Sequence, residues 1–108
     1  MVKNVKHIMK LETSGDVLRV SAIKELGSAN AGAFRDWVRE SLADGLSSIE
    51  VDLSETTFLD SSGLGALVSL HKAASKRQGT LRLLNANPSL RQILDLTRLS
   101  RVFEVVNS

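Results

Sequence analysis

Residues 58–67 read FLDSSGLGAL, and this stretch decides the fold because it places a helix start after a strand. Two serines and two glycines stand at the beginning of what the leucine spacing predicts to be a helix. Glycine inside a helix costs about 1 kcal/mol relative to alanine, so Gly63 and Gly65 lower the stability of the predicted helix. The chain must therefore gain something other than helix stability from such small residues.

The composition is that of one soluble globular domain. A chain of 108 residues is long enough for one hydrophobic core and too short for two. No apolar run approaches the roughly 20 residues that span a bilayer, and the start MVKNVKHIMKLE lacks the apolar segment of a secretory signal. Cysteine is absent, which excludes disulfides and thiolate chemistry and is compatible with the cytoplasmic location that we expect.

The basic residues do not indicate a nucleic-acid site. The formal net charge is +2 and the isoelectric point is near 9.3, which reflects a slight excess of Lys and Arg. These residues are scattered along the chain, and one Trp with no Tyr offers little for base stacking. We therefore expect a solvated basic surface and no direct nucleic-acid partner.

Alternating strands and helices predict an α/β fold. Hydrophobic alternation and turn residues indicate strands at residues 8–12, 17–23, 48–53, 80–84 and 102–106. Helical spacing indicates helices over residues 30–44, from the quoted stretch to residue 77, and from residue 87 onward. The order is β-β-α-β-α-β-α-β, for which right-handed crossovers give a sandwich with a mixed β-sheet.

The helical spacing also predicts which residues of the helices are buried. Gly45 and Gly79 stand where the first two helices should stop. Asn87 and Pro88 read as the cap and first residue of the third helix. The residues expected to face inward from the first two helices are Phe34, Trp37, Val38, Leu42, Leu64, Leu67, Val68 and His71.

No arrangement of residues supports catalysis. Ser62 and His71 are separated by nine residues, which is about 13 Å along a helix, and they project from opposite sides. A nucleophile and its base must come within hydrogen-bond reach. Two histidines and no cysteines give no metal-ligand spacing. We expect no enzyme, no cofactor and no metal, with His71 at the edge of the core.

The helix start can be capped in two ways. If Ser61 is the N-cap, it accepts a hydrogen bond from the N–H of about Leu64 and leaves Ser62 with an unengaged, outward hydroxyl. Alternatively, Asp60 is the cap and both serines lie in the first turn.

A stripe of small residues lies on the helix face opposite the leucines. A solvated helix would carry Glu, Lys or Gln on such a face. Either a partner docks on this stripe or another element of the same domain packs there. The stripe consists of Ser62, Gly65, Ala66, Ser69 and Ala73.

A phosphoryl group on Ser62 would lie at the positive end of the helix dipole, so the fold should tolerate it. It would add about −1.5 to −2 charges beside Asp60. Phosphorylation would then block binding by repulsion and desolvation, without unfolding the domain.

The stretch VDLSETTFLDSSGLGAL, residues 51–67, resembles the signature of STAS domains, specifically bacterial anti-sigma factor antagonists. In that family a strand ending in Asp-Leu-Ser leads to Asp-Ser-Ser-Gly-Leu-Gly at a helix N-terminus. The resemblance extends over the whole chain in element order and implies a single STAS domain over residues 1–108. Gly27 stands where the family usually has Asp, and Arg98 stands where it usually has Gly.

The resemblance implies a binding switch. Such antagonists, when unphosphorylated, bind an anti-sigma factor that is also a serine kinase of the GHKL ATPase type, and so free the sigma factor. The kinase phosphorylates the second serine of the pair, which corresponds to Ser62 here, with Ser61 as the second choice. A PP2C-type phosphatase resets the switch. The family also implies a monomer or weak dimer that needs no membrane.

We predict a docking surface that combines the loop of residues 24–30, the junction of residues 57–63 and the small-residue stripe. Other STAS domains build stressosome-like scaffolds or serve as soluble subunits of lipid transporters, and these roles are the alternatives. The predicted partner-binding residues are Glu25, Leu26, Gly27, Asn30, Thr57, Asp60, Ser61, Gly63, Gly65, Ala66, Ser69 and Ala73.

Overall fold

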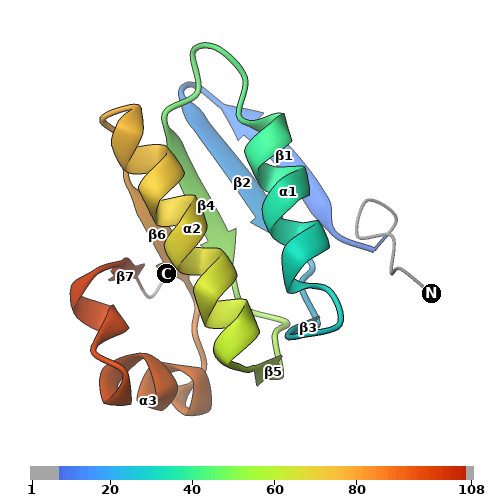
Figure 1. Cartoon of the computed structure of the whole chain (residues 1–108), viewed down its shortest axis with the longest axis vertical. Helices are drawn as coiled ribbons and strands as arrows, with labels where there is room; N and C mark the ends of the chain where they lie inside the picture. Colours follow the sequence, from blue (N-terminus) through green and yellow to red (C-terminus); the bar gives the residue numbers. More distant parts are fainter. Residues whose placement is uncertain (1–7, 107–108) are drawn as a thin grey trace.

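The computed structural model describes residues 8–106. Its main sheet has five strands in the order β1-β2-β4-β6-β7 (Figure 1). β1 and β2 form an antiparallel hairpin, and the other neighbours pair in parallel, so the predicted mixed sheet is confirmed. The strands are β1 (Lys10–Ser14), β2 (Val17–Ser21), β4 (Ser48–Asp52), β6 (Leu81–Leu84) and β7 (Glu104–Val106).

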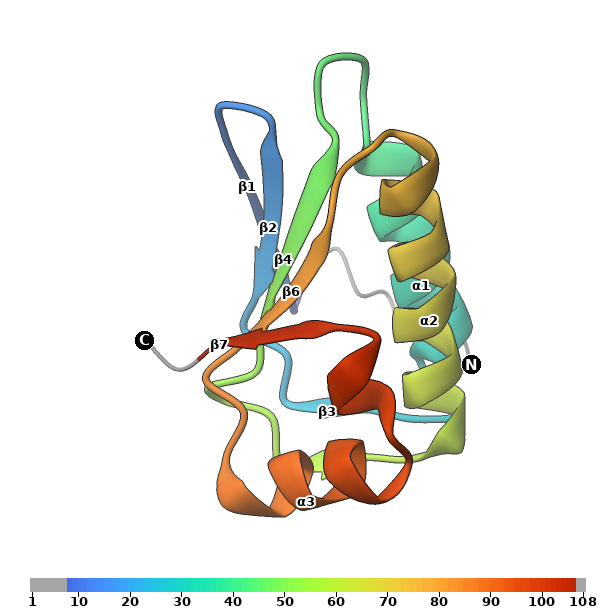
Figure 2. The ribbon, with the colours of Figure 1, turned by 90° about the vertical axis from the view of Figure 1, so that its left-hand side faces the viewer.

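Two helices, α1 (Ala31–Ser41) and α2 (Ser61–Lys76), cover one face of this sheet (Figure 2). A third helix, α3 (Pro88–Leu96), lies beyond the end of the sheet, and a 3-10 turn, η2 (Leu99–Arg101), leads from it to β7. Asn87 caps α3 by accepting a hydrogen bond from the Leu90 N–H at 2.9 Å, as predicted.

The core lies between the sheet and the two covering helices. Alternation along β4 turns Ile49 and Val51 fully inward, and Leu53 just after the strand is also fully buried. On α1, Phe34 and Val38 are fully buried as predicted, whereas Trp37, which was also expected to face inward, is only half-buried. The helices and strands that carry the candidate site therefore rest on a continuous apolar core.

The buried face of α2 differs from the prediction. Leu67 is buried as expected, whereas Leu64, Val68 and His71 are only half-buried. α2 packs against α1 along one flank, which shifts its buried arc toward the small residues. Besides Leu67, the buried residues of this helix are Gly63, Ala66, Leu70 and Ala74.

Some elements differ in extent from the predicted ones. α1 ends at Ser41 because Leu42 leaves the helix with its side chain buried in the core, and Gly45 adopts a φ of 90° in the loop that follows. Two further strands, β3 (Glu25–Leu26) and β5 (Phe58–Leu59), form a separate parallel ladder. Two residues are too few to show an alternation, so the sequence pattern does not predict these strands.

The structure gives a reason for Gly63, the first of the two glycines at the start of α2. A Cβ atom at this position would lie 2.2 Å from the carbonyl oxygen of Leu26 and 2.8 Å from the side chain of Leu59. Only glycine allows the first turn of α2 to approach β3 so closely. At Gly65, by contrast, a Cβ atom would meet nothing within 4 Å.

Asp60 joins the start of α2 to the loop after β3. Its Oδ1 accepts a hydrogen bond from the Gly63 N–H at 3.0 Å, and its Oδ2 accepts one from the Ser28 N–H at 3.1 Å. The Gly63 N–H, above all, holds the pKa of the Asp60 carboxyl below its usual value of 3.8. Asp60 is therefore the N-cap of α2, and we call this pair of bonds the Asp60 clasp.

The two glycines should respond to alanine in opposite directions. Gly63→Ala should lower the free energy of unfolding by about 1–3 kcal/mol, because the new methyl group meets a backbone carbonyl that cannot rotate away. Gly65→Ala should raise it by up to about 1 kcal/mol, because the site is open and alanine favours the helix. Urea denaturation of both variants and the parent measures the difference. Equal effects at the two positions would contradict this account.

The Asp60 clasp should make stability depend on acid pH. Because the pKa of Asp60 is lowered in the folded state, its contribution is present above the unfolded-state pKa and is lost as pH falls through the folded-state pKa. Asp60→Asn keeps an oxygen for Gly63 but cannot also accept well from Ser28. The variant should have a lower urea midpoint at neutral pH, and its deficit should shrink below about pH 4. A deficit that is constant with pH would argue against the clasp.

Candidate functional site

The two serines of the quoted stretch lie in the first turn of α2. Both are exposed, and neither hydroxyl makes a hydrogen bond with any residue that the structure describes. Of the two capping arrangements that the sequence allows, the structure has the one in which Asp60 is the cap. The Ser62 hydroxyl is nevertheless unengaged, as both arrangements allow.

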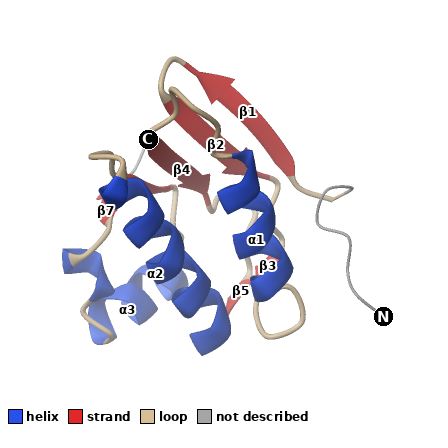
Figure 3. Cartoon of the chain, turned by 45° about the horizontal axis from the view of Figure 1, so that its top comes forward, coloured by secondary structure: helices blue, strands red, loops and turns tan. Residues whose placement is uncertain are grey.

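Ser62 differs from Ser61 in its surroundings. α1 and α2 run side by side in the same direction, so their first turns are neighbours (Figure 3). Between them lies a hollow of about 410 Å³, which we call the serine hollow. Ser62 lines it, whereas Ser61 does not. The other lining residues are Ser28, Ala31, Gly32, Arg35, Gly65 and Ala66.

An exposed aromatic side chain lies close to Gly27, on which the Asp60 carboxylate also packs. Phe58, in β5, is 51% exposed although it is a large apolar residue. Glu25 of the paired strand β3 and Thr57 are also exposed. The exposure of Phe58 cannot be predicted from the sequence, because in a strand of two residues nothing in the pattern tells which side chain faces outward. Aromatic side chains of this kind are common anchors at protein interfaces.

Several of the predicted partner-binding residues are buried in the folded domain. Leu26, Gly27 and Gly63 support the surface from below, since the loop after β3 and the start of α2 pack against each other here. Asn30 is 2% exposed; its side chain accepts from the Gly27 N–H at 3.0 Å and donates to the Glu25 carbonyl at 2.9 Å. These residues hold the loop in shape and offer little surface to a partner.

The small-residue stripe of α2 is covered in part by α1. Ala66 is 4% exposed, and Ser69 and Ala73 are half-buried. Arg39 of α1 donates a hydrogen bond to the Ser69 hydroxyl. The second reading of the stripe, packing by another element of the same domain, therefore explains most of it. Gly65 and Ser62 remain exposed at its N-terminal end.

The structure gives a reason for the glycine at position 27. A Cβ atom there would lie 2.7 Å from Cε2 of Phe58 and 2.8 Å from Oδ2 of Asp60. An aspartate at this position would therefore have to displace the aromatic ring and would place a second carboxylate against Asp60. The glycine is the residue that fits this arrangement of Phe58 and Asp60.

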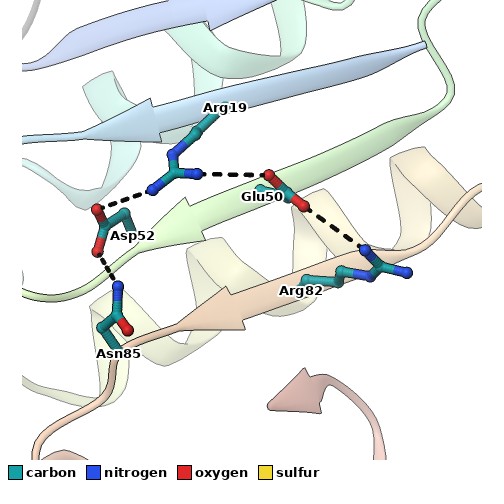
Figure 4. A network of polar contacts seen from close by, with 5 residues as sticks. All are labelled: Arg19, Glu50, Asp52, Arg82 and Asn85. Carbon is teal, nitrogen blue, oxygen red and sulfur yellow. Dashed lines mark hydrogen bonds and ion pairs between the residues drawn. The ribbon is translucent and has the colours of Figure 1, made fainter. Parts of the chain in front are cut away.

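The opposite face of the sheet carries a ladder of alternating charges (Figure 4). Glu50 lies between Arg19 at 3.9 Å and Arg82 at 3.6 Å, and Arg82 also pairs with Glu104 at 3.3 Å. Register extends the alternation to Glu12, opposite Arg19. Cations and carboxylates therefore neutralise each other across neighbouring strands among the described residues of this face.

Asp52 adds a second anchor for Arg19 on that face. Its carboxylate lies 3.3 Å from the Arg19 guanidinium and accepts a hydrogen bond from the Asn85 amide at 3.2 Å. Burial acts to raise the pKa of Asp52, but hydrogen bonds from Ser54, Asn85 and Arg19 outweigh it and leave the pKa lowered. The network in Figure 4 thus holds a charged carboxylate at the end of β4 as part of the sheet.

The described residues provide no metal site, because they contain no group of three or more His, Asp or Glu side chains that could hold an ion. His71 is half-buried and meets Phe103 edge to face, with ring centroids 5.9 Å apart, which confirms its predicted place at the core edge. Within residues 8–106, no helix has the length and apolar character to cross a membrane.

The chain is similar in sequence and fold to known proteins. The anti-sigma-B factor antagonist of Listeria monocytogenes is 34% identical over 59 residues, which are 55% of this chain and 52% of that protein. The chain thus matches about half the length of that curated relative. A solved structure from Thermotoga maritima is 30% identical, with a TM-score of 0.85 over 94% of this chain and 87% of its own.

The fold is also that of the anti-sigma factor antagonist SpoIIAA, whose unphosphorylated form is 19% identical and superposes with a TM-score of 0.80 over 93% of this chain and 87% of its own. Its phosphorylated form, from Bacillus, gives a TM-score of 0.73. The family model described as the STAS domain matches residues 9–108, which is nearly the whole chain. From this match, and from the strand, cap and helix that carry the Asp-Ser-Ser-Gly signature, the chain belongs to the STAS domain family.

Proposed function

We propose that this protein is an anti-sigma factor antagonist that works by partner switching in the cytoplasm. In its unphosphorylated form it binds an anti-sigma factor that is also a serine kinase of the GHKL ATPase type. Phosphorylation of Ser62 ends the complex, and a PP2C-type phosphatase reverses the modification. The observation that carries the proposal is the exposed, unengaged hydroxyl of Ser62 in the first turn of α2.

Two comparisons support this role. The curated relative from Listeria monocytogenes is named an anti-sigma-B factor antagonist, and its match covers about half of each chain. SpoIIAA, which shares the fold, has solved structures in an unphosphorylated and a phosphorylated form. A protein of this architecture therefore keeps its fold when it carries a phosphoryl group.

The site is compatible with a modification that leaves the fold intact. The γ-phosphoryl group of ATP would be transferred to the Ser62 oxygen, with loss of the hydroxyl proton and release of ADP. Because Asp60, not Ser62, caps the helix, the modification breaks no hydrogen bond among the described residues. The phosphate would lie at the positive end of the α2 dipole, and Arg35 lines the same hollow.

The same phosphate would disrupt a docked partner. It adds about −1.5 to −2 charges next to the carboxylate of Asp60 and beside the apolar ring of Phe58. A partner that covers this surface would have to desolvate those charges or face them with its own carboxylates. Both effects weaken the complex without any movement of the domain.

Ser62 should be the single site of modification. After incubation with ATP and the candidate serine kinase encoded nearby, intact mass should show one added phosphate, and peptide mapping should place it on Ser62. Ser62→Ala should take up none and still bind the kinase, while Ser62→Asp should lose binding. Ser61→Ala, the matched control from the same turn, should be modified like the parent. Transfer to Ser61, or tight binding by Ser62→Asp, would overturn the proposal.

Phe58 should be an anchor of the docked partner. Phe58→Ala removes a ring that is 51% exposed, so the domain should stay folded with only a small fall in its urea midpoint. Binding to the same kinase should weaken by at least about tenfold, as for aromatic side chains at interface centres. Leu96→Ala is the matched control, because Leu96 is 76% exposed on α3. Unchanged affinity in Phe58→Ala would remove the ring from the interface.

A further inference from the structure

A second hollow lies between α1 and α2, toward their C-terminal ends. Its volume is about 400 Å³, and four of its lining residues are cations. None of the described residues that line it carries a carboxylate. We call it the basic hollow; it is lined by Arg39, Leu42, Ser69, Lys72, Ala73, Lys76 and Arg77.

Two of these cations, Arg77 and Arg39, form hydrogen bonds that join α2 to α1 and to the loop after it. Arg77 donates through Nη1 to the carbonyl oxygens of Ala43 at 2.9 Å and Leu46 at 3.0 Å, and so ties the loop after α1 to the end of α2. Arg39 donates to the Ser69 hydroxyl across the hollow, which holds its guanidinium there. An arginine carries five N–H donors, and this bond engages one of its nitrogens.

Lys72 and Lys76, in contrast, make no side-chain contact of this kind within the described residues. Both side chains are exposed, and neither side chain forms an ion pair or hydrogen bond with a residue that the structure describes. They lie four residues apart on α2, where like charges repel and cost about 0.2–0.5 kcal/mol. Lys76 in the last turn favours the helix dipole, but Lys72 lies a turn earlier. The structure therefore gathers like charges at some cost and leaves them unneutralised.

We propose that an acidic segment of a partner protein docks along the seam between α1 and α2, from the basic hollow to the serine hollow. This inference rests on the proposed function and specifies the chemistry of the partner. Lys72 and Lys76 attract its carboxylates at one end, and Arg39 pairs with them in the middle. At the other end the segment reaches Ser62 and Arg35, whose charge is already shared with Asp36 at 3.0 Å.

The length of the seam favours a protein segment over a small anion. Ser62 and Lys76 are fourteen helical residues apart, which is about 21 Å at 1.5 Å per residue. Compact phosphate groups bind best at helix N-termini, where backbone N–H groups point at the ligand. The basic hollow instead lies near helix C-termini, where long lysine side chains supply the charge.

An acidic partner makes the effect of phosphorylation stronger. The phosphate on Ser62 would stand at one end of the seam that holds the segment, so it would repel the carboxylates that the cations attract. Arg35 would then face the phosphate and the partner together, and only one of them can use it. The basic hollow thus supplies affinity, and Ser62 controls it.

A titration with a ten-residue polyglutamate peptide tests this surface without any kinase. In ¹⁵N-labelled protein at low salt, the amide signals of Ser69, Lys72, Ala73 and Lys76 should shift, and the shifts should vanish at high salt. The double variant Lys72→Glu, Lys76→Glu should bind at least about tenfold more weakly. The control Lys10→Glu, Arg101→Glu has the same change in net charge at exposed residues of β1 and η2, and should bind like the parent. Shifts elsewhere on the surface, or equal loss in both double variants, would overturn the inference.

Two further measurements separate this inference from the proposed function. If the parent binds phosphatidylserine vesicles but not polyglutamate, the seam binds a membrane surface and not a protein segment, and the inference is overturned. The kinase could bind the parent, modify Ser62 and bind the double variant Lys72→Glu, Lys76→Glu with equal affinity. That result would support the proposed function and overturn the inference of an acidic docking segment. If polyglutamate binds the seam but no kinase modifies Ser62, the proposed function fails alone.

Discussion

The candidate site depends on the carboxylate of Asp60. One oxygen accepts from the Gly63 N–H and the other from the Ser28 N–H, so a single side chain starts α2 and fixes the loop that follows β3. The close approach of α2 to the Leu26 carbonyl is possible because Gly63 has no side chain. Without both, the first turn of α2 would not be pressed against β3, and Ser62 and Phe58 would have no common surface.

The cap also leaves both serine hydroxyls outside the hydrogen bonds that hold the start of α2. A serine at the N-cap position uses its hydroxyl to accept a backbone hydrogen bond. Here the carboxylate of Asp60 satisfies the Gly63 N–H, and the serine hydroxyls are left without that task. A modification of Ser62 can therefore change the surface charge while the hydrogen bonds that hold the helix start remain in place.

The two faces of the domain treat charge differently. On the open face of the sheet, Arg19, Glu50 and Arg82 alternate in register and neutralise each other. On the helix side, Lys72 and Lys76 have no such partners among the described residues. A net charge of +2 therefore conceals a locally basic seam. The formal charge of the chain gives no indication of this asymmetry, because it counts residues without their positions.

Much of the architecture could be predicted from the sequence. The alternation in β4, the spacing in α1 and the Asn87-Pro88 cap of α3 are local patterns, and the structure confirms each of them. β3 and β5 could not be predicted, because a two-residue ladder exists only through pairing with a distant segment. The prediction of which α2 residues are buried was wrong for a similar reason, since the position of α1 decides which flank of α2 is covered.

The sequence by itself determined the order of the elements, the membership of the family and the place of the serine pair at a helix start, because these follow from short-range spacing and turn chemistry. Only the tertiary structure decided that Ala66 is covered, that Phe58 is exposed and that the cations gather at the α1–α2 seam. Arg39 is thirty-three residues from Lys72 along the chain. The two meet only because parallel crossovers place α1 and α2 side by side on the same face of the sheet.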